Sequence, residues 1–397
     1  MMIPHELVEA IVSEADVCSL KACSLVSSGF CAASQRLLFR TLTLKGGREG
    51  GPSIWHPNYT RANLLLTKSP HLAAYTTHLE IYLPTSATPA DEIESLRRVL
   101  LKLVYVRHCL LHGVNIWARW SRYPPNLSSD LLDFLLTQEL KSLRIQSLAE
   151  IPPQPFQSFL ASAPKLHFSH VSMKWGPAEV SRITSPRLSS ITTTPTELLL
   201  GKDSTDASDL LSRSQFSAHL SSLRRLAVTV IKTDSAINLF SSVSSTLRFV
   251  CLDCRDFTKP HFSLPLPALP HLHSFEIILD IGRRTQPWFL ESLDQIIASN
   301  QNSSLQEIII SYSGVERYRA NPFYVPLLRE LESLLLDLPL GIPRLRWRLG
   351  YGPVHVRQHG SANFVELKEL YKKEMPELEG MKKLVVEKFE MDWRENV

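Results

Sequence analysis

A leucine-containing phrase that recurs along most of the chain constrains the fold more than any other feature of the sequence. Each copy has a leucine or another apolar residue, two variable residues and a second apolar residue, and then alternates apolar with polar residues. Alternation with a period of two is typical of a strand, because successive side chains of a strand point to opposite faces. Clear copies begin at Leu140, Leu223, Leu247, Leu272, Leu305 and Met381, and weaker copies begin near Leu79, Lys165, Leu188 and Leu345.

Helix-like segments separate these expected strands. The copies follow one another at intervals of roughly 22–40 residues, which is the range found in repeat proteins. One strand–helix unit cannot cover its own apolar face, whereas neighbouring units stacked side by side can. We therefore expect an α/β fold in which a parallel sheet with outer helices forms an open, curved solenoid of irregular repeats. The clearest helical segments are residues 90–103, 128–137, 156–161, 286–299, 325–336 and 363–373.

The N-terminal part of the chain has a different, mostly helical pattern. Leu7 and Ile11 are four residues apart and mark one face of a first helix. A second helix is expected to follow a cap at Asp16 or Ser19. Helices this short bury little surface alone, so each needs a neighbour in the chain or in a partner. The apolar residues expected on the second helix are Leu20, Cys23, Leu25, Val26 and Phe30.

A glycine-rich stretch, from Gly46 to Pro52, follows the helical pattern. It lacks the Lys and Ser/Thr that end a phosphate-binding loop, so we interpret it as a linker. The chain is thus expected to have three parts. They are a helical docking module at residues 1–45, a linker with Gly and Pro at 46–58, and the repeat region at 59–397.

The overall composition is that of an ordinary folded protein. Of 397 residues, 44% are hydrophobic and 21% are charged, and the net charge of +4 gives no reason to expect nucleic acid or an anionic membrane as partner. The first residues are too polar for a signal peptide, and no stretch approaches the ~20 apolar residues of a membrane span. A cytoplasmic or nuclear protein with free thiols is therefore expected.

The helical pattern resembles an F-box. That family pattern opens with Leu-Pro-x-Glu-Leu, which reads Ile3-Pro4-His5-Glu6-Leu7 in this chain. It continues to a Leu, a Val and a terminal Trp at intervals that this chain matches without a gap, with Phe30 at the aromatic position. The stretch from Cys23 to Leu44 is similar to fungal, especially basidiomycete, F-box proteins. The repeats are similar to the degenerate leucine-rich repeats that commonly follow fungal F-boxes.

This resemblance implies the adaptor of a ubiquitin ligase. F-box helices bind a Skp-type linker protein, which connects them to a cullin–RING ligase, and the repeats then hold the target protein. Alternatively, the same apolar side chains pack against the first repeat and have no partner. By the resemblance, the residues that bind the Skp-type adaptor are Pro4, Leu7, Ile11, Leu20, Cys23, Val26 and Phe30.

The solvent-facing side of the expected sheet is the candidate surface for a target protein. If the apolar residues of each strand face the core, the alternate residues face the concave side, where each is either a binding residue or simply solvated. An aromatic group formed by Trp117, Trp120, Tyr123 and Trp175 is either a binding hot spot or the cover of a strand edge. The candidate target-binding residues are Arg144, Gln146, Thr229, Asp253, Glu276, Arg346 and Arg348.

Signals for catalysis or metal binding are weak. Cys251 and Cys254 have the spacing of metal ligands, but no second Cys pair completes a zinc site. No Gly-x-Ser-x-Gly elbow is present. We therefore expect a binding protein without catalytic residues, metal or cofactor. Two alternatives stay open: a stand-alone repeat scaffold for protein–protein binding, and a hydrolase, which needs a deep pocket with a nucleophile beside a His.

Overall fold

The computed structural model describes the greater part of the chain, in two compact units, Met1–Pro195 and Thr196–Val397. We call them unit 1 and unit 2 and describe each by itself. The described residues are 3–46, 58–85, 88–113, 118–174, 193–230, 233–255, 266–280, 288–299, 305–313, 325–338, 341, 343–351 and 360–390.

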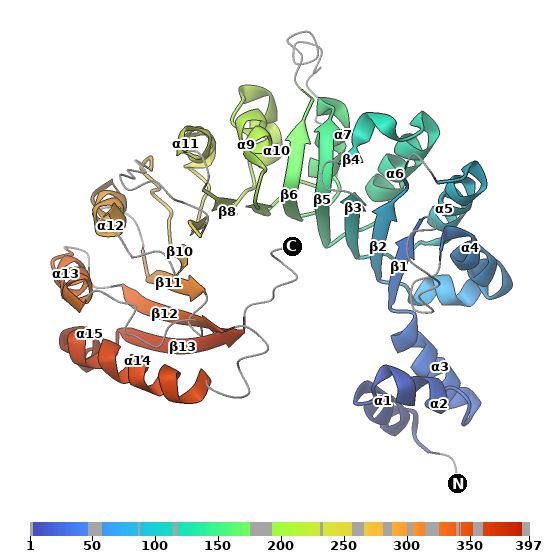
Figure 1. Cartoon of the computed structure of the whole chain (residues 1–397), viewed down its shortest axis with the longest axis horizontal. Coiled ribbons are helices and arrows are strands. Elements are labelled where there is room, and N and C mark those ends of the chain that lie inside the picture. Colours follow the sequence, from blue (N-terminus) through green and yellow to red (C-terminus); the bar gives the residue numbers. More distant parts are fainter. Residues whose placement is uncertain are drawn as a thin grey trace. The chain divides into compact units, whose positions relative to one another are not determined.

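Unit 1 is built on a parallel sheet whose strands lie side by side in chain order (Figure 1). A parallel pair needs a crossover connection, and a helical segment on one face of the sheet supplies it. The strands are β1 (Thr41–Lys45), β2 (His78–Leu83), β3 (His108–Gly113), β5 (Ser142–Ile151) and β6 (Lys165–Met173), with β4 (Ala118–Arg119) paired to β5. The crossover helices are α4 (Tyr59–Lys68), η1 (Pro70–Tyr75), α5 (Ala90–Lys102), η2 (Trp120–Arg122), α6 (Pro125–Thr137) and α7 (Pro153–Leu160).

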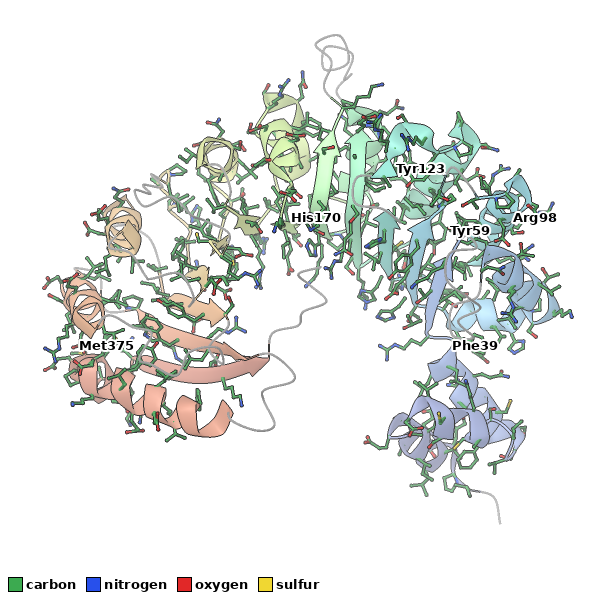
Figure 2. The ribbon with its side chains drawn as sticks, in the orientation of Figure 1. Phe39, Tyr59, Arg98, Tyr123, His170 and Met375 are labelled. Atoms are coloured by element: carbon green, nitrogen blue, oxygen red, sulfur yellow. The ribbon has the colours of Figure 1, made fainter. Side chains whose placement is uncertain are left out.

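The core of unit 1 lies between this sheet and its helices. Alternate residues of each strand, such as Leu79 and Ile81 of β2, are fully buried there. Tyr59 and Tyr123 lie on the helix side of the strands (Figure 2). The Tyr59 hydroxyl donates a hydrogen bond to the Tyr82 carbonyl, which pays part of the cost of burying a phenol.

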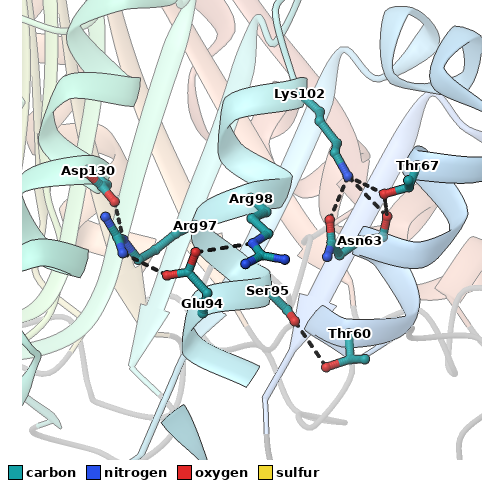
Figure 3. Close-up of polar contacts among 9 residues, drawn as sticks. All are labelled: Thr60, Asn63, Thr67, Glu94, Ser95, Arg97, Arg98, Lys102 and Asp130. Atoms are coloured by element: carbon teal, nitrogen blue, oxygen red, sulfur yellow. Dashed lines mark hydrogen bonds and ion pairs between the residues drawn. The ribbon is translucent and has the colours of Figure 1, made fainter. Parts of the chain in front are cut away.

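Polar contacts join neighbouring helices of unit 1 (Figure 3). Lys102 of α5 donates to the Asn63 side-chain oxygen (2.6 Å) and to the Thr67 hydroxyl (2.5 Å), both on α4. Arg97 of α5 pairs with Asp130 of α6. Exposed pairs of this kind add little stability each, but they fix the register of helix against helix.

Unit 2 repeats the same plan (Figure 1). Its core contains the stacked rings of Tyr312, Trp347 and Tyr371, with 5.6 Å between the first two ring centres and 4.7 Å between the last two. The strands, again in chain order, are β7 (Glu197–Leu200), β8 (Arg225–Thr229), β9 (Phe249–Asp253), β10 (Ser274–Asp280), β11 (Glu307–Ser313), β12 (Arg344–Tyr351) and β13 (Leu384–Glu390). The helices are α9 (Thr205–Leu211), η4 (Ser214–Phe216), α10 (Ser217–Leu220), α11 (Thr233–Val243), α12 (Trp288–Ser299), α13 (Val325–Leu336), α14 (Gly360–Glu374) and α15 (Pro376–Gly380).

The expected α/β fold with a parallel sheet and helices is confirmed. All described copies of the leucine-containing phrase run into a strand. The copy near Leu188 and residues 47–57 of the expected linker lie outside the described residues. The strands β3 and β7 and the helices α4, α9 and α11 were not predicted from the sequence.

The prediction of one long second helix was wrong. The N-terminal helices are α1 (His5–Ser13), α2 (Val17–Cys23) and α3 (Ser28–Leu38). Asp16 caps α2 by accepting from the Ser19 amide (2.7 Å), as expected. A new cap then starts α3, because extended Ser27 accepts from the Phe30 amide (3.4 Å). Leu25 and Val26 therefore lie in the turn between two helices.

Candidate functional site

The three N-terminal helices form a small module with its own core. Val8, Val12, Leu20 and Ala33 are its buried residues. Four partly buried residues pack against them, namely Ala15, Phe30, Leu37 and Leu38. The module is fixed to the sheet through α3, which runs by way of Phe39 into β1 (Figure 2) and contacts η1. Thr76, directly after η1, donates to the Phe39 carbonyl (3.2 Å).

The module leaves many large apolar side chains in solvent. Leu7 and Ile11 are 55% and 52% exposed on α1, and Leu25 and Val26 are 86% and 67% exposed in the turn before α3. Scattered exposed leucines are normal on a protein surface, but this density within one short module is not. We call these four residues, with Ile3 and Pro4, which are also exposed, the module surface.

The structure divides the residues predicted to bind an adaptor into two groups. Pro4, Leu7, Ile11 and Val26 are exposed and belong to the module surface. Cys23 and Phe30 are half-buried, and Leu20 lies inside the module core. Leu20 thus supports the module surface from within, since its side chain already has apolar neighbours.

A second candidate surface is the face of the unit 1 sheet that points away from the helices. Residues alternate along each strand, so the half-buried positions of neighbouring strands line up in rows across this face. We call it the unit 1 face. Its rows are Thr41, His78, His108, Ser142 and Lys165, then Thr43, Glu80, Leu110, Arg144 and His167, then Lys45, Tyr82, His112, Gln146 and Ser169.

Aromatic rings in these rows contact one another across strands. The His78 and His108 rings are stacked with 4.4 Å between their centres, and the Tyr82 and His112 rings lie 4.9 Å apart. The Lys45 ammonium lies 4.3 Å from the centre of the Tyr82 ring. Such cation–π and ring contacts hold these aromatic side chains in a fixed arrangement on the face.

The histidines of the unit 1 face are uncharged at neutral pH. Burial lowers the pKa of His78 and His108, and nearby cations, including Arg40, lower both further. Burial also lowers the pKa of His112, and lowers that of His167 to about 3 with a further contribution from Arg144. These rings therefore offer hydrogen-bonding and stacking groups without charge.

Two predicted target-binding residues, Arg144 and Gln146, belong to the unit 1 face. With its amide group turned, Gln146 accepts from the Arg144 guanidinium at 2.6 Å, and its side chain is almost fully buried. Arg144 is half-buried on the middle row. Arg144 therefore provides the charge at this place, and Gln146 holds it in position.

The other predicted target-binding residues lie in unit 2, where the equivalent face is occupied by ion pairs. Glu276 is only 6% exposed and accepts from the Ser311 hydroxyl (2.7 Å) and from Arg348 (3.0 Å). Arg346 pairs with Glu307 (2.8 Å). Both arginines also pair with Glu387 of the last strand, at 3.3 Å each.

The remaining two residues of that prediction are also engaged. Asp253 pairs with Arg255 (2.6 Å) and contacts the Thr229 hydroxyl at 3.5 Å. These acids and bases of the unit 2 face thus pair with one another, within one segment for Asp253 and Arg255 and between strands for the others. We call Asp253, Arg255, Glu276, Glu307, Arg346, Arg348 and Glu387 the unit 2 ion-pair network.

The cysteine pair and the aromatic group noted in the sequence are largely part of the protein core. Cys251 and Cys254 are free and buried, and burial raises the pKa of both thiols. No group of metal-ligating side chains occurs among the residues that the structure describes. Trp120 and Tyr123 are buried, and the Trp120 ring lies 5.5 Å from Phe159, so both belong to the core. Trp117 and Trp175 lie outside the described residues.

One contact bears on the hydrolase alternative. His108 Nδ1 and Ser142 Oγ lie 2.8 Å apart on the unit 1 face. In the described part of the chain no carboxylate hydrogen-bonds to the other nitrogen of His108. The pair therefore lacks the acid that orients a catalytic triad, and it lies in a row of an open sheet face.

Within the described residues, no helix has both the length and the apolar character needed to span a membrane.

Comparisons with models of protein families and with curated proteins gave no match for this chain. The candidate surfaces therefore rest on geometry. Sequence reasoning did not predict the histidines of the unit 1 face, although His108 and His112 stand at alternate positions of one strand. The missing information was the existence of β3 itself.

Proposed function

We propose that this chain is a substrate-recognition adaptor of a Skp/cullin/F-box-type ubiquitin ligase. In this proposal the N-terminal module is an F-box that binds a Skp-type linker protein through the module surface. The leucine-rich-repeat-like sheets hold the target protein, and the ubiquitin chemistry is done by other subunits. The chain then needs neither a catalytic residue nor a cofactor of its own.

The exposure of the module surface is the observation that carries the proposal. The module already has a closed core around Leu20, so Leu7, Ile11, Leu25 and Val26 are not needed for its folding. Covering the exposed half of each such side chain is worth about 1 kcal/mol before the cost of association. Several such side chains together can support a stable protein contact.

A stand-alone scaffold, in which the module only caps the repeats, finds less support. A cap should bury its apolar residues against the neighbouring repeat, as α3 does in part through its contact with η1. Val26 is 67% exposed and Leu7 is 55% exposed, so the described part of unit 1 leaves them uncovered. An apolar surface that the chain itself does not cover favours a partner.

The test is co-purification of the whole chain with a Skp-type adaptor. We expect the wild-type chain to retain the adaptor, and the double variant Leu7→Asp/Val26→Asp to lose it, with affinity at least about 100-fold weaker. Both positions are exposed, and an acid in the first turn of α1 suits the helix dipole, so folding should be kept.

Leu64→Asp is the matched control. Leu64 is 53% exposed on α4, much as Leu7 is on α1, but it lies outside the module. This variant should retain the adaptor. If the wild-type chain does not bind a Skp-type adaptor, or if the control loses binding as the double variant does, the proposal fails.

A further inference from the structure

The unit 1 face carries more basic than acidic side chains. Its three rows contain Lys45, Arg144 and Lys165 but a single carboxylate, Glu80. Glu80 accepts from the Thr43 hydroxyl at 3.0 Å. Two further cations, Arg40 and Lys141, are exposed at the entry of these strands. The three rows therefore hold three basic side chains and one acidic one, a local excess of positive charge in a chain whose net charge is only +4.

The cations are spaced, with uncharged rings between them. Lys45 lies on β1 in the third row, Arg144 on β5 in the second and Lys165 on β6 in the first. With about 4.8 Å between strands and about 3.3 Å per residue along a strand, this diagonal is about 23 Å long, equal to about seven residues of an extended peptide. Tyr82 and His108 lie between its ends.

We propose that the unit 1 face binds an extended acidic segment of a target protein, whose carboxylates pair with Lys45, Arg144 and Lys165. The proposal deepens the adaptor function and rests on it for the biological role of the segment. Between the charged contacts, the rings of Tyr82 and of the histidines pack against the remaining side chains of the segment.

A peptide fits this face better than a nucleic acid. A nucleic acid strand carries a charge at every nucleotide and needs a dense line of cations. Here Glu80 lies on the middle row, and neutral rings separate the basic residues. Carboxylates at intervals in a peptide match this spacing, and the peptide can avoid Glu80.

The test is selection from a random library of displayed peptides, each about twelve residues long, on the whole chain without adaptor. We expect the selected peptides to be enriched in Asp and Glu over the starting library. The double variant Lys45→Glu/Lys165→Glu should lose this enrichment, and should bind the best selected peptide at least about tenfold more weakly.

The matched control is Arg61→Glu/Lys68→Glu, which makes the same change of charge on exposed positions of α4. It should keep the enrichment and the affinity. Thermal unfolding of both double variants checks that each is folded.

Three results would overturn the inference: no acidic enrichment, equal loss in the control, or tighter binding of a random RNA pool than of the selected peptides. Because no adaptor is present, the outcome is independent of the test of the module surface. A chain that selects acidic peptides but does not bind a Skp-type adaptor would keep this inference and remove the ligase role.

Discussion

Glu80 in unit 1 and Glu276 in unit 2 stand at similar places, each in a strand and on the side of its sheet that faces away from the helices. Glu276 is buried and accepts hydrogen bonds from Ser311 and Arg348. Arg346 is in turn paired with Glu307 and Glu387. Glu80 accepts from the Thr43 hydroxyl, and the three rows of its face hold the cations Lys45, Arg144 and Lys165.

This difference shows that the position of a charged residue on a strand does not by itself make it a binding residue. Whether it can bind a ligand also depends on whether nearby strands supply the opposite charge. In unit 2 they do, so the charges there are part of the structure, and removing one leaves another without its partner. In unit 1 the three rows hold three cations and a single acid, Glu80, so we propose that a ligand brings the matching carboxylates.

The largest expected effect is in the unit 2 ion-pair network. Glu276→Ala should lower the free energy of unfolding by about 2–3 kcal/mol, because a buried Arg348 contact and the Ser311 hydrogen bond are both lost. Urea unfolding followed by tryptophan fluorescence measures this. The control is Glu291→Ala, an exposed acid in the first turn of α12, which should cost about 0.5 kcal/mol. Equal losses in the two variants would contradict a structural role for the network.

A smaller effect should follow from the neutral histidines of the unit 1 face. The folded pKa of His167 is about 3, against 6.5 for a free histidine, so only the unfolded chain takes up this proton between pH 7 and pH 5. Stability should therefore fall on acidification, with His167 contributing about 1–2 kcal/mol by pH 5.

His167→Gln should remove that part of the pH dependence. At pH 7.5, where neither state binds the proton, the His167 charge contributes nothing, so the variant measures the cost of the substitution itself. Unfolding curves at several pH values separate the two contributions. A variant with an unchanged pH dependence would show that His167 is not held in its neutral form.

The smallest effect is expected at Lys45, which we compare with Arg346 by replacing each residue with methionine, a long side chain without charge. Lys45→Met should change the free energy of unfolding by less than about 0.5 kcal/mol, since the Tyr82 contact is its main interaction. Arg346→Met should cost about 1–2 kcal/mol, because Glu307 and Glu387 lose a shared partner. Similar costs at both sites would remove the distinction between the two faces.

The sequence predicted much of the fold because the information is local. The phrase at Leu305 alternates within a few residues and becomes β11, and residues 325–336 become α13. Strand β3 was missed because its apolar core residues, Cys109 and Leu111, stand between two histidines without the leading leucine. The break after Cys23 depends on the Ser27 cap, which a helical pattern of apolar residues hides.

The sites were harder to predict because they depend on contacts between distant segments. Glu276 and Arg348 are 72 residues apart in the chain, so their pairing has no local pattern. The exposure of Leu7 and the burial of Leu20 also depend on how α1 and α2 pack against α3. Both residues look alike in the sequence, yet they have opposite places in the module.

Amide hydrogen exchange of the whole chain, with and without a Skp-type adaptor, tests the central claim most directly. The claim is that the module binds the adaptor and leaves the sheet face free for a target. Exchange should slow in α1 and around Leu25 and Val26 when the adaptor is added, and should stay unchanged in β1, β2, β3, β5 and β6. Slowed exchange in these strands, or none in the module, would contradict the account.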